Sequence, residues 1–291
     1  MIDLHCHSIY SDGEFTPNEL LKKSEELKLN YFSITDHNNC FAYEDIDKSQ
    51  FTGNLITGVE IVTSFEKHII EILGYGIEIE EINNWCRKGV EKERRYAKII
   101  YERLINIFEK NGISYTENKQ IDNIIKQEDP TGLIKQFVYN DLLKYNNNKK
   151  VIGDEILSSY SAFNKNGLNN PNSLLFVNEF ERFPEIKEVV DIIHKNKGLC
   201  FLAHLYQYNV ENHIDFLNKI LKEVELDGVE TYHSSFTKKQ IIEINDYADK
   251  INLYKSGGSD YHGRLKPGIK LGLDLTIPEE IIKPWIKKIN I

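Results

Sequence analysis

The sequence predicts an α/β fold whose strands and helices alternate at both ends of the chain and are interrupted by a helical insertion. Short β-like runs alternate with helical patterns over residues 1–80 and again from residue 175, whereas residues 81–174 hold helical patterns and few strand-like runs. A strand–helix–strand rhythm with short loops is typical of parallel strands, so both ends are expected to build a parallel sheet. The length of 291 residues and the 41% of hydrophobic residues suit an α/β barrel or a domain that carries an insertion.

The first predicted strand carries polar side chains on one of its faces. Residues 2–7 read IDLHCH, so one set of alternate side chains is apolar and the other contains His5 and His7. Asp12 follows in the loop that contains the letters SDG. The letters TPNE then predict the start of a helix, with Thr16 as its cap and Glu19 closing a capping box.

The other elements expected before residue 175 follow in order. Strands are predicted at residues 31–37, 54–63 and 68–78. The insertion is expected to begin with one long amphipathic helix that ends at Gly112. Further helical segments are predicted at residues 118–127, 131–145 and 153–166.

The alternation of helices and strands resumes after the insertion. The letters FPEIKEVVDIIHKNKG predict a helix that ends before Gly198, and LCFLAH predicts a buried strand that ends at His204. A strand over residues 227–233, a helix over 237–251 and a strand that turns into a loop over 253–263 complete the pattern.

Charge and composition argue against several classes of protein. The formal net charge of −9 argues against binding to long nucleic acid, which needs a basic surface. No stretch approaches the roughly 20 apolar residues of a membrane helix, and the N-terminus does not read as a signal peptide. The four cysteines are scattered, which is typical of reduced thiols in a cytoplasmic protein.

Almost every predicted strand ends in a residue that can bind a metal ion. Because the carboxyl ends of parallel strands meet at one rim, residues far apart in the sequence are expected to converge there. Imidazole and carboxylate groups together suit zinc, manganese or iron. His233 lies at another strand end and is expected to contact the substrate. The candidate metal ligands and their neighbour Asp36 are His5, His7, Asp12, Asp36, His37, Glu60, His204, Asp260 and His262.

Six short motifs in this order resemble a known family. The chain reads DLHCHSIYSDG, ITDH, GVEI, LGYGIE, LAH and GGSDYHG, which is similar to the polymerase and histidinol phosphatase (PHP) superfamily of metal-dependent phosphoesterases. The resemblance is strongest to its small nucleotide phosphatases. It implies a distorted (β/α)7 barrel, like a TIM barrel, formed by residues 1–80 and 175–291. Residues 81–174 are then a helical insertion expected to act as a lid.

The resemblance also implies two or three divalent ions, either manganese, zinc or iron. A histidine is usual in the family at the place of Glu71, so the third site is expected to differ here. The implied first set is His5, His7, Glu60 and Asp260; the second is Asp12, His37 and His262; the third is Glu60, His204 and Glu71.

The predicted activity is hydrolysis of a small phosphorylated substrate, a nucleotide or nucleoside bisphosphate, by a hydroxide generated at the metal centre. Asp36 is expected to orient an imidazole, and His204 to contact the phosphate or protonate the leaving group. Lys135 stands in the stretch where the family's nucleotide phosphatases place a substrate-binding arginine, and is predicted to supply that charge.

Two alternatives to this function remain open at this point. One is a phosphodiesterase or exonuclease that acts on short oligonucleotides, and the other is a metal-binding protein without catalysis. A carbon–nitrogen hydrolase is disfavoured, because no lysine stands at a strand end where such enzymes carry a carboxylated one. The sequence predicts no oligomeric state.

Overall fold

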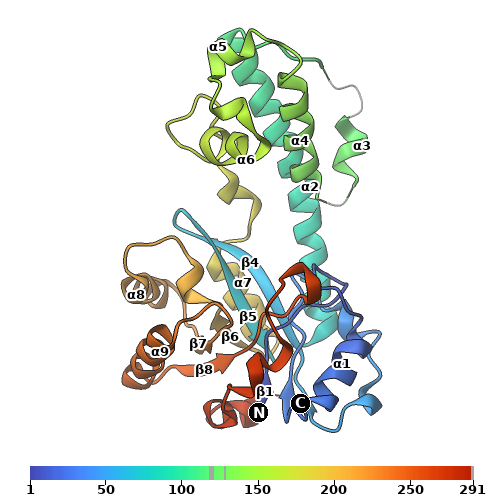
Figure 1. The fold of residues 1–291 in the computed structure, drawn as a ribbon, viewed down its shortest axis with the longest axis vertical. Coiled ribbons are helices and arrows are strands. Elements are labelled where there is room, and N and C mark those ends of the chain that lie inside the picture. Colours follow the sequence, from blue (N-terminus) through green and yellow to red (C-terminus); the bar gives the residue numbers. More distant parts are fainter. Residues whose placement is uncertain (118–120, 128, 290–291) are drawn as a thin grey trace. The chain divides into compact units, whose positions relative to one another are not determined.

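The computed structural model describes residues 1–117, 121–127 and 129–289 (Figure 1). Internal contacts divide the chain into two compact units. The first consists of Met1–Cys86 and Pro184–Ile291, and the second consists of Arg87–Phe183. Among the helices of the described residues, none is long and apolar enough to cross a membrane. All four cysteines are free and buried.

The first unit contains two sheets. The smaller sheet has three parallel strands, β1 (Ile2–Asp3), β2 (Tyr31–Phe32) and β3 (Asn54–Leu55). The larger sheet has five strands in sequence order, β4 (Gly58–Phe65), β5 (His68–Tyr75), β6 (Leu199–Leu202), β7 (Gly228–Tyr232) and β8 (Tyr254–Gly257).

The prediction of a parallel sheet is wrong for one of these strands, β5. β5 runs antiparallel to both β4 and β6, whereas the pairs β6–β7 and β7–β8 are parallel. Only Glu66 and Lys67 join β4 to β5, and Glu66 adopts a φ of 52°. A parallel crossover needs about a dozen residues. A connection of this length therefore permits only a hairpin.

Backbone contacts join the two sheets at both of their neighbouring edges. On one side, Cys6 forms an isolated parallel bridge to Tyr261, and the amide of Leu4 donates to the carbonyl of Gly257 over 3.1 Å. On the other side, His37 bridges to Glu60. The α/β class is therefore confirmed, while the described strands form two bridged sheets and not one continuous barrel.

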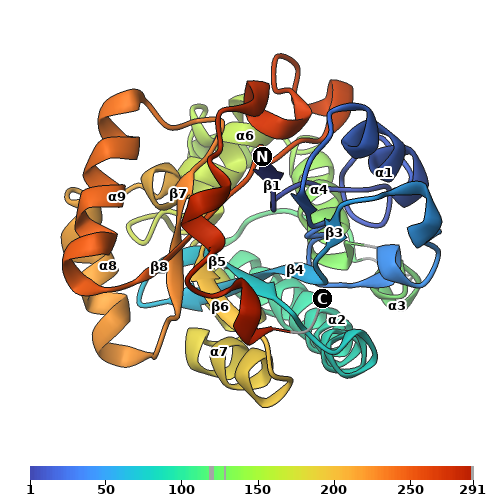
Figure 2. The same cartoon turned by 90° about the horizontal axis from the view of Figure 1, so that it is seen from below.

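Helices lie outside the strands of the first unit (Figure 2). Helix α1 (Pro17–Glu26) begins with the predicted capping box of Thr16 and Glu19. Helix α8 (His213–Glu223) is not predicted from the sequence; Asn212 caps it by accepting a hydrogen bond from the amide of Asp215. Helices α7 (Ile186–Lys195) and α9 (Lys238–Ile251) also belong to this unit.

The second unit is helical in its described residues and has a hydrophobic core of its own. Its long helix α2 begins in the first unit and is followed by Gly112 at a φ of 65°, which ends the helix as predicted. The helix predicted over residues 118–127 is described only from residue 121, because residues 118–120 lie outside the described ranges. The helices are α2 (Ile79–Asn111), α3 (Ile121–Ile125), α4 (Pro130–Leu142), α5 (Asn148–Ile152) and α6 (Tyr160–Ala162).

Candidate metal centre

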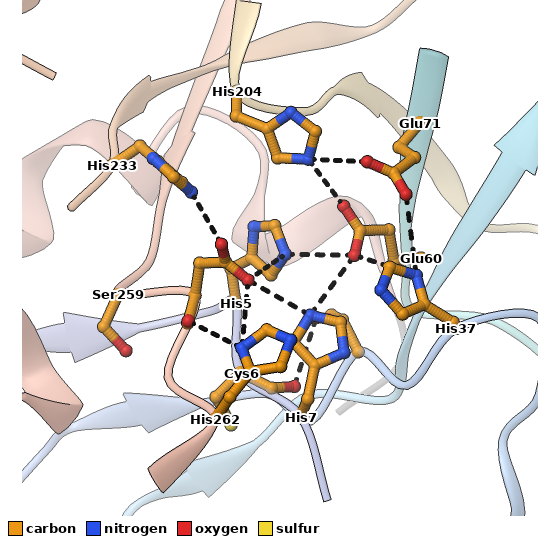
Figure 3. A network of polar contacts seen from close by, with 12 residues as sticks. His5, Cys6, His7, His37, Glu60, Glu71, His204, His233, Ser259 and His262 are labelled. Atoms are coloured by element: carbon orange, nitrogen blue, oxygen red, sulfur yellow. Dashed lines mark hydrogen bonds and ion pairs between the residues drawn. The ribbon is translucent and has the colours of Figure 1, made fainter. Parts of the chain in front are cut away.

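Histidines and carboxylates from seven strands of the first unit meet in one cluster (Figure 3). Most of these side chains are buried, but Asp12 is 55% exposed, which leaves the cluster open to solvent at that point. The cluster comprises His5 and His7 after β1, Asp12 in the loop that follows them, His37 after β2, Glu60 in β4, Glu71 in β5, His204 after β6, His233 after β7, and Asp260 and His262 after β8.

Glu60 lies at the centre of this cluster. Its Oε2 is 3.3 Å from His5 Nε2, 3.2 Å from His7 Nε2 and 3.3 Å from His37 Nδ1. Its Oε1 is 3.0 Å from His204 Nε2. One carboxylate therefore faces imidazoles on two sides, as a residue that bridges two ions would.

Asp260 is a second carboxylate that contacts several histidines of the cluster. Its Oδ1 lies 3.3 Å from His7 Nε2 and 3.6 Å from His5 Nε2. The backbone approaches closely here, since a Cβ added at Gly258 would lie 2.3 Å from the amide nitrogen of His5. Asp260 itself has a φ of 56°, so the chain turns sharply after β8 and directs the carboxylate inward.

Asp12 completes a third group nearest the solvent. Its Oδ1 lies 3.1 Å from His262 Nε2, 3.5 Å from His7 Nδ1 and 3.8 Å from His37 Nε2. Four ligand atoms, one each from His7, Asp12, His37 and His262, lie within 4.8 Å of one another.

Hydrogen bonds fix the tautomers of three histidines. His5 donates from Nδ1 to Glu230 over 2.9 Å, and His262 donates from Nδ1 to the carbonyl of Asp260 over 2.9 Å. The Nδ1 of His7 lies 3.3 Å from Ser11 Oγ, which donates its own proton elsewhere and so accepts here. Each Nε2 therefore carries a lone pair that points at carboxylate oxygens.

These orphaned lone pairs fit a metal ion. In the described part of the chain, Nε2 of His5, His7 and His262 is buried and has no hydrogen-bond partner. A lone pair and a carboxylate oxygen repel each other unless a cation lies between them. Ligand atoms around one zinc or manganese ion lie about 3.0–3.4 Å apart, since each bond is about 2.1 Å long. The separations of 3.1–3.6 Å from these Nε2 atoms to carboxylate oxygens match that spacing.

His204 and Glu71 are arranged differently. His204 Nε2 lies 3.0 Å from Glu60 Oε1 and 3.0 Å from Glu71 Oε2, so this atom already has hydrogen-bond acceptors. In the described residues it is instead the Nδ1 of His204 that is buried without a partner. A proton on Nε2 faces both carboxylates here, so this nitrogen of His204 offers no lone pair to a cation.

His233 faces Asp260 with its Nε2, which has no hydrogen-bond partner among the described residues. Its Nδ1 accepts a hydrogen bond from the amide of Ser235 over 3.1 Å, so the ring proton of the neutral imidazole is on Nε2. That Nε2 lies 3.3 Å from Asp260 Oδ2. His233 therefore presents a proton to the cluster, in keeping with a contact to an anion.

The close packing of charges shifts several pKa values. Burial disfavours the charged imidazole of His7, but Asp260 and Glu60 outweigh burial and raise its pKa to about 9. Glu60 and Glu71 likewise overcome burial and raise the pKa of His204 to about 10. Burial opposes ionisation of Asp12, yet His262, His7 and His37 lower its pKa. Without a cation, protons on the imidazoles balance the charge of the carboxylates, and a divalent ion would displace those protons.

Two of the predicted site residues lie outside this cluster. Among the described residues, Asp36 forms no hydrogen bond with an imidazole. It accepts hydrogen bonds from the amide and hydroxyl of Ser8 and from Ser11 Oγ, at 2.6–2.7 Å. It therefore reaches His7 through Ser11. Lys135 lies in α4 of the second unit, where its side chain is buried.

The sequence analysis missed Glu230. This residue of β7 is fully buried, accepts a hydrogen bond from His5 Nδ1, and accepts another from the amide of His204 over 2.8 Å. It thus orients one cluster histidine and fixes the backbone of a second. A signal is present in the sequence, since a charged glutamate stands inside the strand predicted over residues 227–233.

Comparisons with known proteins give a consistent picture. The model of the PHP domain matches residues 3–247. The 5'-3' exoribonuclease Rnm of Escherichia coli is 27% identical over 97% of this chain and 92% of its own length. The 3',5'-nucleoside bisphosphate phosphatase of Chromobacterium violaceum is 20% identical over 95% of this chain and 92% of its length. A solved structure of a protein from Bifidobacterium adolescentis, described as a metal-dependent phosphoesterase, has 19% sequence identity and a TM-score of 0.62 to this chain. The match extends over 100% of this chain and 96% of the other, so the two share a fold.

Proposed function

The chain belongs to the PHP domain family, and we propose that it hydrolyses phosphoester bonds of nucleotide substrates with the help of at least two divalent ions. One observation carries this proposal: buried imidazole lone pairs of His5, His7 and His262 face carboxylate oxygens at metal-ligand spacing. An arrangement of that kind is costly unless cations occupy it.

The contacts of the cluster support two ligand sets. His5, His7, Glu60 and Asp260 would hold one ion, and Asp12, His37 and His262 a second. Manganese, zinc and iron all accept these ligands. Such ions, when bound, offset the negative charge of a phosphate ester and activate water as a nucleophile.

Other side chains would position the substrate and move a proton. His204 is suited to protonate the leaving group, because its Nε2 faces the centre of the cluster. His233 presents an Nε2 proton that can bond a phosphate oxygen. Asp36 would act at a distance, by holding the Ser8–Ser11 loop that fixes His7. A contact of Lys135 with the substrate stays a prediction.

Two substrates are candidates. Removal of nucleotides from the 5' end of short RNA is favoured by similarity along nearly the whole chain to proteins named as exoribonucleases. Removal of a phosphate from a nucleoside 3',5'-bisphosphate is favoured by the likeness to a phosphatase of that name, and by the net charge of −9, which disfavours long RNA.

The experiment compares these substrates with manganese present. The purified protein is given an aryl phosphate, a nucleoside 3',5'-bisphosphate and a 5'-phosphorylated oligoribonucleotide of a few nucleotides. We expect hydrolysis that a chelator abolishes and manganese restores. Release of mononucleotides from the oligoribonucleotide favours the first candidate, and release of phosphate from the bisphosphate alone favours the second. Unchanged turnover by the metal-free protein would refute the whole proposal.

We also propose a fold interpretation for the first unit. The two sheets would be parts of one distorted barrel formed by residues 1–80 and 175–291, with residues 81–174 inserted. The Cys6–Tyr261 and His37–Glu60 bridges support it, because they join the sheets at two separate edges.

A further inference from the structure

One lysine from the loop after β8 turns back onto the cluster. Lys266 Nζ lies 2.7 Å from Asp260 Oδ2 and donates a hydrogen bond to it. The lysine side chain is 42% exposed, whereas that of Asp260 is 5% exposed. The ammonium therefore lies between solvent and a buried carboxylate of the cluster.

Other cations on the same loop have partners outside the cluster. The guanidinium of Arg264 pairs with Glu14, and the ammonium of Lys270 lies 2.9 Å from Asp274 Oδ1. Lys266 differs from both because its partner belongs to the cluster itself.

The two carboxylate oxygens of Asp260 face different groups. Oδ1 faces His5, His7 and the ring of His262, and Oδ2 faces His233 and Lys266. A cation held on the Oδ1 side would share the single negative charge of the carboxylate and weaken its attraction for the lysine. An ammonium also carries three donors, of which the Asp260 contact uses one.

We propose that Lys266 binds a phosphate group of the substrate beside the metal centre. This inference rests on the proposed function and names a residue for its substrate contact. Lys266 is a flexible cation half in solvent, so it can turn from Asp260 to a phosphate oxygen without a change in the backbone. The phosphate would lie between Lys266 and the Nε2 proton of His233, which both face the same carboxylate oxygen.

The test measures binding of inorganic phosphate to the manganese-loaded protein by calorimetry. We expect Lys266→Met to weaken phosphate binding about tenfold or more, and Lys266→Arg to keep it within about threefold, because a charge-assisted hydrogen bond is lost only in the first. Lys270→Met is the matched control, since it removes a lysine of the same loop whose partner is Asp274; it should change binding less than about twofold.

A second titration, of manganese without phosphate, separates this role from an indirect one. We expect Lys266→Met to bind manganese at least as tightly as the unchanged protein. Unchanged phosphate binding in Lys266→Met, or a loss of manganese affinity as large as the loss of phosphate affinity, would overturn the inference. Failure of the proposed function is distinguishable: the unchanged protein would then hydrolyse no phosphoester, whatever its phosphate affinity.

Discussion

The two sides of the histidine cluster differ in which imidazole nitrogen lacks a hydrogen-bond partner among the described residues. Around His5, His7 and His262, each Nδ1 has a hydrogen-bond acceptor and each Nε2 is orphaned beside carboxylates. Around His204 and Glu71 the pattern is reversed, since His204 Nε2 bonds two carboxylates and its Nδ1 is the orphan. The first side offers Nε2 atoms without partners to a cation, whereas the Nε2 of His204 on the second side already faces two acceptors.

The difference between the two sides depends on the hydrogen-bond partners of each histidine ring. The outer partners Glu230 and Ser11 select the tautomer that directs a lone pair inward. No described residue does this for His204. We therefore propose that metal ions bind chiefly on the His5, His7 and His262 side, and that proton transfer occurs on the other.

The largest effect is expected from loss of a ligand on the metal-binding side. Asp12→Ala or His262→Ala should lower phosphoesterase activity in manganese by more than about a thousandfold, because each removes several kcal/mol of charge stabilisation. Circular dichroism should show an intact fold. Turnover equal to that of the unchanged protein in either variant would remove that residue from the mechanism.

A smaller loss should follow from removing an outer partner. Glu230→Gln weakens the acceptor that holds His5 Nδ1, so manganese affinity should fall about 10- to 100-fold. Calorimetric titration with manganese measures this, and a thermal melt checks that the buried substitution leaves the protein folded. An affinity within about twofold of the original would show that Glu230 does not orient His5 for binding.

The manganese affinity of the metal-binding side should depend on pH through His7. Its pKa of about 9 without a cation means that a proton must leave when an ion binds. Because binding releases that proton, manganese affinity should rise about tenfold per pH unit below pH 9. Titrations at several pH values, in buffers of different ionisation enthalpy, count the protons. Affinity that is constant from pH 6 to pH 8 would contradict the shift.

The smallest effect is expected from Glu71→Gln, which makes the same chemical change as Glu230→Gln on the other side of the cluster. Manganese binding should change less than about threefold, because Glu71 bonds a protonated His204 Nε2. A loss as large as that of Glu230→Gln would erase the distinction between the two sides and indicate an ion between Glu71 and His204.

Some of this arrangement could be predicted from the sequence. The alternation in IDLHCH predicts that His5 and His7 point to the same side, and both do reach the cluster although β1 ends at Asp3. The letters GGSD indicate a close backbone approach before Asp260. The hairpin of β4 and β5 was missed, because Glu66 and Lys67 carry no glycine or asparagine to mark a tight turn.

Partners set by long-range contacts could not be predicted. Glu230 joins His5 across 225 residues, and Lys266 reaches Asp260 only because its loop folds back. Asp36 adjoins His37 in sequence, which suggested a direct contact with an imidazole, yet its hydrogen bonds go to Ser8 and Ser11. Such contacts depend on the packing of distant segments, which local patterns do not specify.

The most direct test counts the ions that the protein binds. After removal of metals with a chelator, equilibrium titration with manganese should give about two tightly bound ions per chain, and Asp12→Ala should bind one fewer. Fewer than one ion per chain, or the same number in a variant that lacks both Asp12 and His262, would contradict the assignment of these residues to a shared metal centre.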